Sequence, residues 1–283
     1  MRKVKPLCLR LNDIEYMSWL KKILSKKEIH SYYLTICCIA KDEDDYLSEW
    51  INFHLKAGVD YFYIYDNGSK VPIKTIISEA GLSAYVKVIE MPGKSKQVKA
   101  YKNCLRRFGK TSKWIAFIDL DEFILAKSTK GNLPLFLKAY EPYGALAVNW
   151  QMFGSAYHLK RTNRPQLESF TLKAEENYYK NTHVKSIVQP KYVKDKGNAH
   201  FFKFIDGYFA VNENFNIVEG SFSNVSVNKI QINHYYCRSL EEYKEKVIRG
   251  IADTKRPRQM DEFYEHDRDS NALEDKTILG LFS

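Results

Sequence analysis

Strand-like and helix-like segments alternate through the first half of the chain, and this alternation limits the possible folds more than any other feature. Runs of β-forming residues are each followed by a stretch with apolar residues at helical spacing. The expected strands are 33–40, 61–65, 85–89 and 114–118, and the expected helices are 44–57, 73–80 and 97–108. Repeated βα units with short connections predict an α/β fold, in which helices cover both faces of a mostly parallel sheet.

The pattern is less regular beyond Gly144. We expect strands at 145–152, 201–211 and 229–236, and a helix at 240–248 that ends before Gly250. The chain has no internal repeat or linker-like tract. We therefore predict a basic amphipathic N-terminal segment (1–30), one main domain with an irregular C-terminal region (31–250) and a charged C-terminal extension (251–283).

Composition narrows the class of protein. Of the 283 residues, 45% are hydrophobic and 28% are charged, which is ordinary for a globular protein. The longest strongly apolar run, 34–40, is far shorter than the roughly 20 residues of a membrane-spanning helix. No secretory signal pattern is visible, and the five scattered cysteines include no C-x-x-C pair. We expect a cytoplasmic protein without a zinc site or a disulfide framework.

The formal charge of +10 is concentrated in two places. Residues 1–30 hold eight basic and three acidic residues around an amphipathic helix pattern, and 91–118 holds eight basic residues and no acid. A basic amphipathic helix suits an anionic membrane surface, and equally suits packing on the domain with a solvated lysine face. The basic residues of 91–118 could bind nucleic acid or a phosphorylated small molecule, or simply be exposed to solvent.

Acidic residues at strand ends are the main chemical signal. No dinucleotide-binding glycine pattern and no P-loop is present. Instead, Asp66 ends one expected strand, and Asp119 and Asp121 follow another, where alternation in an extended segment would place both on one side. Two convergent carboxylates favour a divalent cation, which could bridge the protein to a diphosphate. A nucleotidyltransferase would use the same elements, and a basic nucleic-acid-binding domain is the non-enzymatic alternative.

Six segments in order resemble glycosyltransferase family 92 and its bacterial family-2-like relatives. They are ICCIAKDEDDYLSEWINFHLKAGVDYFYIYDNGS, QVKAYKNCL, WIAFIDLDEFI, NWQMFGS, HVKSIVQP and INHYYCRSLEEYKEKVIRG, which span about 33 to 250. The resemblance implies a GT-A type, Rossmann-like fold, a nucleotide-sugar donor, a divalent metal (Mn²⁺ or Mg²⁺) and inversion at the anomeric carbon. By analogy with animal members, it implies UDP-galactose as the donor.

The resemblance also assigns residues. Asp119 and Asp121 match the family's D-x-D, which holds metal, diphosphate and ribose. Lys41 and Glu43, with Asp42 in place of the family's middle Asn, would line the nucleoside pocket together with Asp66. We expect His234 as a late metal ligand and His200 as the second choice, because imidazole suits Mn²⁺. Lys185 is the expected diphosphate contact.

Inverting transfer needs one base to take the proton of the acceptor hydroxyl. Glu168 is the first candidate and Glu122 its rival. Trp150, Phe153 and His158 are candidates to stack on an acceptor sugar. The resulting hypothesis is a metal-dependent inverting transferase that moves a sugar from a UDP-sugar to a glycan or lipid-linked glycan acceptor, without a nucleic-acid partner. We expect it in bacterial surface polysaccharide synthesis, with peripheral contact at the inner face of the plasma membrane.

Overall fold

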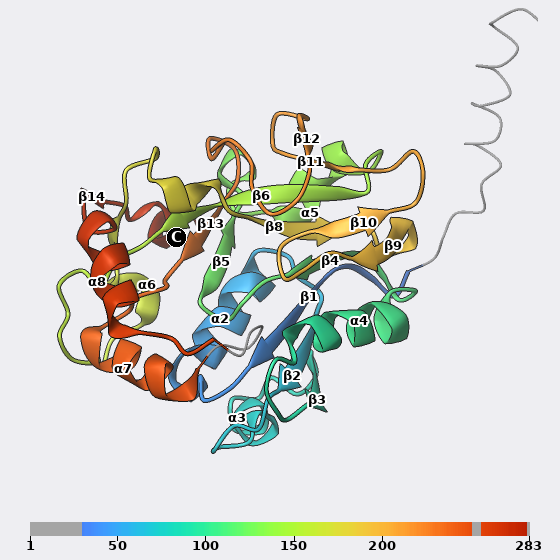
Figure 1. The fold of residues 1–283 in the computed structure, drawn as a ribbon. Helices are drawn as coiled ribbons and strands as arrows, with labels where there is room; N and C mark the ends of the chain where they lie inside the picture. The colour runs from blue at the N-terminus through green and yellow to red at the C-terminus, as the bar shows by residue number, and fades with distance from the viewer. Residues whose placement is uncertain (1–29, 251–255, 282–283) are drawn as a thin grey trace, which may run out of the picture. The chain divides into compact units, whose positions relative to one another are not determined.

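The computed structural model describes residues 30–250 and 256–281, whose main feature is a ten-stranded sheet flanked by helices (Figure 1). Eight strands follow the order β12-β11-β6-β8-β4-β1-β2-β3, and β13 joins β5 to β6. The strands of this sheet are β1 (Tyr32–Ala40), β2 (Tyr61–Asp66), β3 (Val86–Glu90), β4 (Ser112–Phe117), β5 (Glu122–Leu125), β6 (Ala145–Met152), β8 (Val184–Val188), β11 (Ala210–Val211), β12 (Ile217–Val218) and β13 (Gln231–His234).

The strands expected from the βα alternation form the parallel half of the sheet. Strand β1 pairs in parallel with β2 on one side and with β4 on the other, and β2 pairs in parallel with β3. Strand β8 then runs antiparallel to both β4 and β6. The expected α/β fold with a mostly parallel sheet is therefore confirmed, and the antiparallel strand marks the start of the less regular half.

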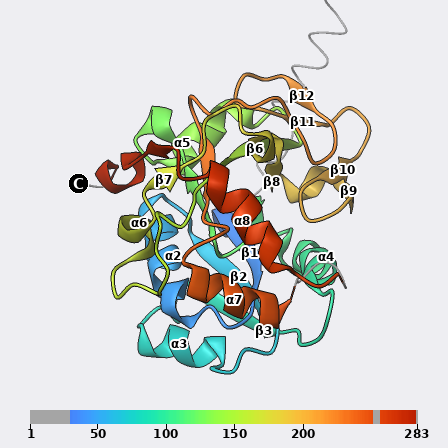
Figure 2. The ribbon, with the colours of Figure 1, turned by 60° about the vertical axis from the view of Figure 1, so that its left-hand side comes forward.

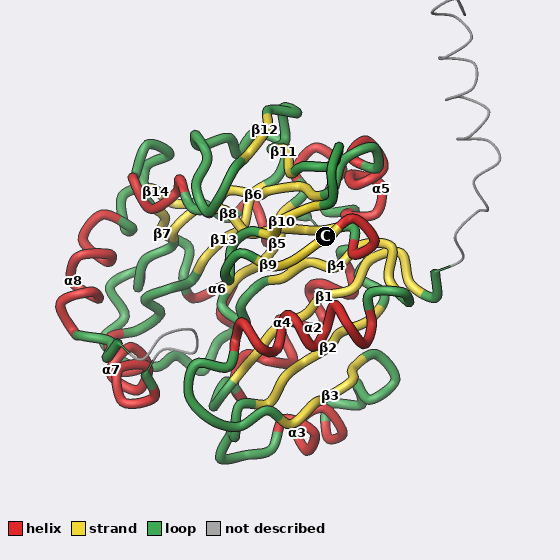
Figure 3. The backbone as a smooth tube through the Cα atoms, turned by 45° about the vertical axis from the view of Figure 1, so that its right-hand side comes forward, coloured by secondary structure: helices red, strands yellow, loops and turns green. Residues whose placement is uncertain are grey.

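Alternation along the buried strands divides the core between the two faces of the sheet. In β1, Leu34, Ile36 and Cys38 belong to the cluster that includes the helices of one face, whereas Cys37 and Ile39 belong to the cluster of the other. Helices α2 (Asp44–Lys56), α3 (Ile73–Glu79) and α5 (Leu133–Leu137) pack with the first cluster, and α4 (Gln97–Phe108) packs with the second (Figures 1 and 3).

Two C-terminal helices pack together beside the sheet (Figure 2). Helix α7 (Leu240–Arg249) begins at Ser239, whose hydroxyl forms a capping box with Glu242, and α8 (Met260–Asp269) meets it through Tyr243 and Phe263. The two oxygens of Asp267 on α8 accept hydrogen bonds from the backbone and hydroxyl of Ser155. Residues 256–281, expected to form an extension, thus pack on the main domain, and the described residues from Ser31 onward form one compact unit.

Two short strand pairs lie outside the ten-stranded sheet. Strand β9 (Val193–Lys196) pairs with β10 (Phe202–Phe204), and β7 (Leu172–Lys173) pairs with β14 (Leu273–Glu274). A short helix, α6 (Gln166–Ser169), precedes β7.

The structure corrects two local expectations. Residues 201–211 are not one strand, because a turn at Gly207, with φ of +85°, separates β10 from β11. Asp119, Leu120 and Asp121 lie in a turn after β4 rather than in an extended segment, since the backbone N–H of Glu122 donates to Asp119 O.

Some predictions concern residues whose structure is not described. The predicted amphipathic helix within 1–30 lies outside the described residues, apart from His30. Within 30–250 and 256–281, no helix is long and apolar enough to cross a membrane.

Candidate active site

A cavity of about 370 Å³ lies at the carboxyl ends of β1, β2 and β4, which is where open α/β sheets bind ligands. One wall comes from the βα loops and the start of α4, and the other from β6, β13 and the C-terminal segments. Its polar and aromatic lining includes Lys41, Asn67, Gln97, Asp119 and Asp121 on the first wall, and Trp150, His200, His234, Tyr236 and Arg258 on the second. The cavity therefore collects several of the residues that the sequence singles out.

Asp119 is held from the protein side of the cavity. Its Oδ1 accepts a hydrogen bond of 2.6 Å from Gln97 Nε2, and its Oδ2 lies 2.6 Å from Lys185 Nζ. Lys185 is 1% exposed and also lies 3.5 Å from Glu122 Oε2. Lys185 is absent from the cavity lining, so the structure places it as the counter-charge of Asp119 and Glu122 rather than in contact with a diphosphate.

Asp121 lies between a lysine and a histidine. Its Oδ2 is 2.7 Å from Lys246 Nζ, and its Oδ1 is 3.6 Å from His234 Nε2. Burial alone would raise the pKa of Asp121, but the Lys246 ammonium and His234 hold the pKa of this carboxyl well below its usual range. Burial lowers the pKa of His234, so the imidazole is neutral and able to bind a cation.

The Asp121–His234 pair fits a divalent cation. Two protein ligands that bind one Mn²⁺ or Zn²⁺-sized ion at about 2.0–2.2 Å lie roughly 3–3.5 Å apart, close to the separation observed here. The ring of His234 is oriented by packing against Trp150 and Tyr236, while its Nδ1 is buried without a hydrogen-bond partner among the described residues.

The four predicted metal ligands do not form one cluster. Asp119 is engaged by Gln97 and Lys185, and His200 donates from Nδ1 to the Val184 carbonyl at 2.9 Å. The described part of the chain contains no group of three or more His, Cys, Asp or Glu side chains placed to hold a metal ion. The structure thus brings together Asp121 and His234, and any further ligands of a cation would come from the substrate or from water.

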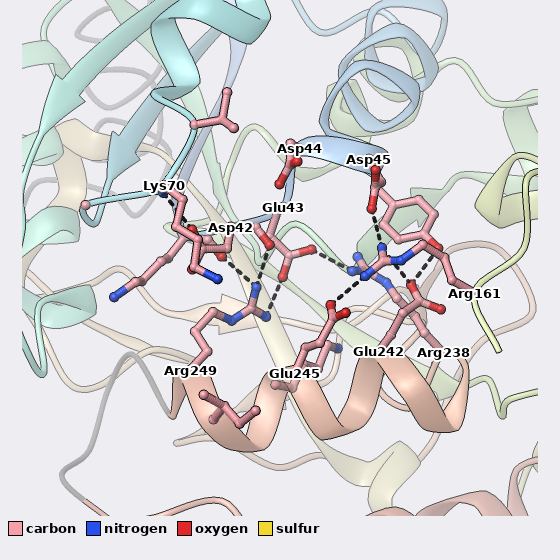
Figure 4. A pocket seen from close by; sticks show the side chains of 16 residues that line it. Asp42, Glu43, Asp44, Asp45, Lys70, Arg161, Arg238, Glu242, Glu245 and Arg249 are labelled. Atoms are coloured by element: carbon pink, nitrogen blue, oxygen red, sulfur yellow. Dashed lines mark hydrogen bonds and ion pairs between the residues drawn. The ribbon is translucent and has the colours of Figure 1, made fainter. Parts of the chain in front are cut away.

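Glu43 forms the wall between this cavity and a second one of about 550 Å³ (Figure 4). Its two oxygens each lie 2.6 Å from a guanidinium, one from Arg238 and one from Arg249. Burial would raise the pKa of Glu43, but the two arginines lower it to about 2. Arg249 also donates to the backbone carbonyls of Lys41 and Asp42. Glu43 therefore ties α7 to the loop after β1, while Lys41 lines both cavities.

The second cavity is lined by equal numbers of acidic and basic side chains. Arg161 crosses it and forms ion pairs with Asp45 on α2 and with Glu245 on α7 (Figure 4). This balanced set of ion pairs joins α2, α7 and the loop that carries Arg161, and it has no excess charge that would select a charged ligand.

Asp66, a predicted nucleoside contact, has a structural role instead. Its Oδ1 accepts from the backbone N–H groups of Gly68 and Ser69, and its Oδ2 accepts from that of Ile73. Asp66 is buried and does not line the cavity. The neighbouring Asn67 does line it, held by hydrogen bonds of 2.8 Å from its Nδ2 to the carbonyls of Met91 and Gly93.

Neither predicted base faces the cavity. Glu168 is 45% exposed on α6, outside the lining, and pairs with Arg164 at 3.2 Å. Glu122 is fully buried beneath Asp119, whose N–H donates to its Oε2 at 2.8 Å. Burial, with Asp119 and Asp121 nearby, raises the pKa of Glu122 well above its usual range despite Lys185. A base must reach the acceptor hydroxyl, and these two positions do not provide that contact.

Of the three predicted sugar-stacking residues, Trp150 lines the cavity. Phe153 is buried in the core, and His158 lies against Phe170 and the Ser169 carbonyl. Trp150 instead contacts two cavity histidines, His234 at 4.3 Å and His200 at 5.3 Å between ring centroids.

Three residues in or near this site were not predicted from the sequence. Lys246 and Gln97 are buried polar residues on amphipathic helices. For Gln97, its place on the otherwise apolar face of α4 was the available signal, whereas Lys246 shares the buried face of α7 with Glu242. Arg258 lies 5.1 Å from the ring of Tyr236, and its Nε and Nη1 are buried without a hydrogen-bond partner among the described residues. Nothing in the densely charged sequence around Arg258 distinguishes it from its neighbours.

The fold and this site define an α/β protein with a polar ligand cavity at the carboxyl edge of its sheet. Residues 30–278 match the model of glycosyltransferase family 92, and the chain belongs to this family. The resemblance seen in the sequence is thereby confirmed.

Curated relatives come from plants. A glycosyltransferase family 92 protein of Oryza sativa subsp. japonica is 27% identical over 236 residues, covering 80% of this chain and 37% of the relative. One from Ricinus communis is 25% identical over 236 residues, covering 78% of this chain and 38% of the relative. The chain therefore spans little more than a third of the length of these relatives.

Solved structures share a more distant likeness. Residues 1–349 of S. aureus TarS are 14% identical with a TM-score of 0.38, over 56% of this chain and 47% of TarS. Glucosyl-3-phosphoglycerate synthase from Mycobacterium tuberculosis, in a complex with Mn²⁺, UDP and its product, is 16% identical with a TM-score of 0.30, over 42% of this chain and 44% of the synthase.

Proposed function

We propose that this chain is a metal-dependent inverting glycosyltransferase that moves a sugar from a UDP-sugar to a glycan acceptor. The observation that carries the proposal is the pair Asp121 and His234, which face each other across 3.6 Å inside the cavity at the carboxyl edge of the sheet. Such a pair supports binding of a divalent cation next to a diphosphate.

The lining suggests how a nucleoside diphosphate would lie. The loop residues Lys41 and Asn67, together with Gln97, offer polar groups on the side of the cavity near β1 and β2. On the opposite wall, the guanidinium of Arg258 lies against Tyr236, and its Nε and Nη1 have no hydrogen-bond partner among the described residues. We assign the wall near β1 and β2 to the nucleoside and Arg258 to the diphosphate, because a guanidinium with such N–H groups can pair with phosphate oxygens.

Asp121 and His234 would hold the cation. When bound, it would supply positive charge that stabilises the departing diphosphate. Arg258 in the lining and Lys246, which is buried behind Asp121, add fixed positive charge near the cation in a partly buried setting where such charges act strongly.

His200 is the group that we assign as base. Its Nδ1 donates to the Val184 carbonyl, which can only accept, so Nε2 carries the free lone pair. Burial, followed by Lys185, lowers the pKa of His200 to about 3, so the ring is neutral near pH 7 and would act as a base when the negative charge of a bound diphosphate raises this pKa. In the transfer, the acceptor oxygen bonds to the anomeric carbon, the bond from that carbon to the diphosphate breaks with its electrons going to the diphosphate, and the hydroxyl proton passes to Nε2.

The donor sugar and the cellular setting are finer proposals. Galactose as the donor sugar is supported by the resemblance to animal members of the family. Contact with the cytoplasmic face of a membrane is supported by the basic composition of residues 1–30, and a role in surface polysaccharide synthesis by the resemblance to bacterial family-2-like relatives. Cell fractionation of the wild type, compared with a variant whose basic residues in 1–30 are replaced by Gln, tests the membrane contact.

A screen of nucleotide-sugars for hydrolysis in the presence of Mn²⁺ tests the function, because transferases slowly pass their sugar to water. We expect release of UDP from one UDP-sugar, with UDP-galactose first in the series, and loss of this release in EDTA. Release of pyrophosphate from a nucleoside triphosphate, with no UDP-sugar hydrolysed, would favour a nucleotidyltransferase instead. His200→Gln should slow transfer while UDP binding is kept.

A further inference from the structure

Phe222 is a large apolar side chain that the fold holds in an exposed position. It is 59% exposed, although the backbone on both sides of it is fixed. The carbonyl of Ser221 accepts from Val184 N at 3.0 Å, and the N–H of Ser223 donates to Thr182 O at 2.8 Å. Phe222 therefore faces solvent from a short bridge with His183 rather than from a loosely held loop.

The buried side chain of Asn149 on β6 strengthens this placement. Its Nδ2 lies within hydrogen-bond distance of the carbonyls of Thr182 and Ser223, at 3.4 Å in each case. Its Oδ1 accepts from the N–H of Ser226 at 3.3 Å. One buried amide thus joins the two segments that carry His183 and Phe222 to the central sheet, so the position of the exposed ring is preorganised.

The rings form a continuous row from the surface to the proposed cation site. Phe222 meets His183 edge-on at 4.6 Å between centroids, and His183 stacks on Trp150 at 4.8 Å and 12°. Trp150 contacts His234 at 4.3 Å, and His234 faces Asp121. We call Phe222, His183 and Trp150 the aromatic track. It begins at the wall of the active-site cavity and ends in solvent.

The chemistry of the track suits a sugar chain. A pyranose ring presents an apolar C–H face and a rim of hydroxyl groups, and ligand sites for such molecules combine aromatic surfaces with a few polar groups. His183 donates from Nδ1 to the Lys180 carbonyl at 3.0 Å, which leaves Nε2 as an acceptor for a hydroxyl. The exposed ring of Phe222 offers such an apolar surface, and it lies two ring contacts away from Trp150 in the cavity wall.

We propose that the aromatic track binds the acceptor glycan, and that sugar units beyond the reacting one lie over Phe222. The acceptor is accordingly an oligosaccharide or polysaccharide end rather than a single sugar. This inference rests on the proposed function, since it uses the cavity at Asp121 as the place of transfer.

Binding to an array of defined oligosaccharides, with UDP and Mn²⁺ present, tests the track. The variants are Phe222→Ala and a matched control, Tyr85→Ala, whose side chain is 45% exposed just before β3 at the opposite, amino end of the sheet. We expect the wild type and Tyr85→Ala to bind a common set of glycans of two or more sugars, and Phe222→Ala to bind them at least about tenfold more weakly.

Calorimetric titration of the same proteins with UDP and Mn²⁺ separates the two claims. The inference predicts unchanged UDP binding in Phe222→Ala, because Phe222 is outside the donor cavity. Equal glycan binding by Phe222→Ala and the wild type, or UDP binding by a wild type that binds no glycan on the array, overturns the track. Absence of UDP binding by the wild type overturns the proposed function. If the wild type and Tyr85→Ala nevertheless bind glycans and Phe222→Ala does not, the track is still supported as a glycan-binding site.

Discussion

The ammonium of Lys246 lies 2.7 Å from Oδ2 of Asp121, on the carboxylate whose other oxygen faces His234. Lys246 is buried and is also fixed by a hydrogen bond of 2.8 Å to the Tyr236 carbonyl. The fold thus places the Lys246 ammonium permanently beside the proposed metal-binding carboxylate of Asp121. A divalent ion at Asp121 and a protonated Lys246 repel each other, so the lysine opposes metal binding until the diphosphate brings negative charge.

Lys246→Met should therefore bind Mn²⁺ more tightly in the absence of nucleotide, by about tenfold if roughly 1.4 kcal/mol of repulsion is removed. Titration calorimetry with Mn²⁺ measures the change. Lys244→Met, an exposed neighbour on α7, is the control and should keep wild-type affinity. Equal or weaker Mn²⁺ binding by Lys246→Met would show that the ammonium does not compete with the ion.

Lys185→Met should destabilise the fold strongly. It leaves Asp119 and the buried Glu122 without their counter-charge, and breaking a buried ion pair costs about 3–5 kcal/mol. Urea unfolding measures this loss, and adding Glu122→Gln should restore part of it. The control Lys102→Met removes only the exposed ion pair with Asp195 and should cost less than about 1 kcal/mol. Equal losses in the two lysine variants would contradict the buried role of Lys185.

The ion pairs of Glu43 predict a specific dependence of stability on pH. Arg238 and Arg249 lower its pKa from 4.5 to about 2 against the effect of burial. A carboxyl with a lowered pKa in the folded state stabilises fully above its unfolded pKa, and the contribution, about 3 kcal/mol, is lost as the pH falls from about 4.5 to 2. The free energy of unfolding, measured in urea at several pH values, should fall across this window.

Glu43→Gln should flatten that dependence between pH 4.5 and 2. It should also unfold more easily at pH 7, because two buried guanidinium groups lose their partner. Glu79→Gln, exposed on α3, should keep the wild-type slope. A Glu43→Gln variant with the wild-type slope would mean that other carboxyls cause the acid sensitivity.

Arg258→Met should weaken binding of UDP and leave binding of uridine unchanged, because the unpaired Nε and Nη1 of Arg258 are assigned to the diphosphate. We expect a loss of about tenfold or more for UDP, as for a charged hydrogen bond worth about 1.5–3 kcal/mol. Arg268→Met on the exposed side of α8 is the control. A parallel loss of uridine affinity would place Arg258 at the nucleoside instead.

Much of the fold could be predicted from the sequence because the parallel strands are buried on both faces. A run such as 33–40 therefore appears in the sequence as an unbroken stretch of β-forming residues. Helices α2 and α3 end shortly before Gly58 and Gly81, which adopt positive φ. The prediction of one strand over 201–211 was wrong because apolar residues lie on both sides of the turn at Gly207. Periodicity does not distinguish one strand from two that belong to different sheets.

The two proposed metal ligands lie near strand ends. Asp121 lies in the turn between β4 and β5, and His234 ends β13, so strand ends together with the family resemblance pointed to both. The sequence did not indicate the contacts of Lys185 and Glu168. Lys185 pairs with Asp119 and Glu168 pairs with Arg164, and these contacts depend on tertiary packing and on an irregular loop. The Glu43 ion pairs join residues almost two hundred positions apart, which no local pattern reveals.

The most direct test of the central claim is calorimetric titration of UDP into the protein with Mn²⁺ and with EDTA, for the wild type, Asp121→Asn and the exposed control Asp44→Asn. We predict Mn²⁺-dependent binding in the wild type and in Asp44→Asn, and a loss of at least about tenfold in Asp121→Asn, as expected when a metal ligand is removed. UDP binding that is equally strong in EDTA, or unchanged in Asp121→Asn, would contradict a metal-dependent donor site at Asp121 and His234.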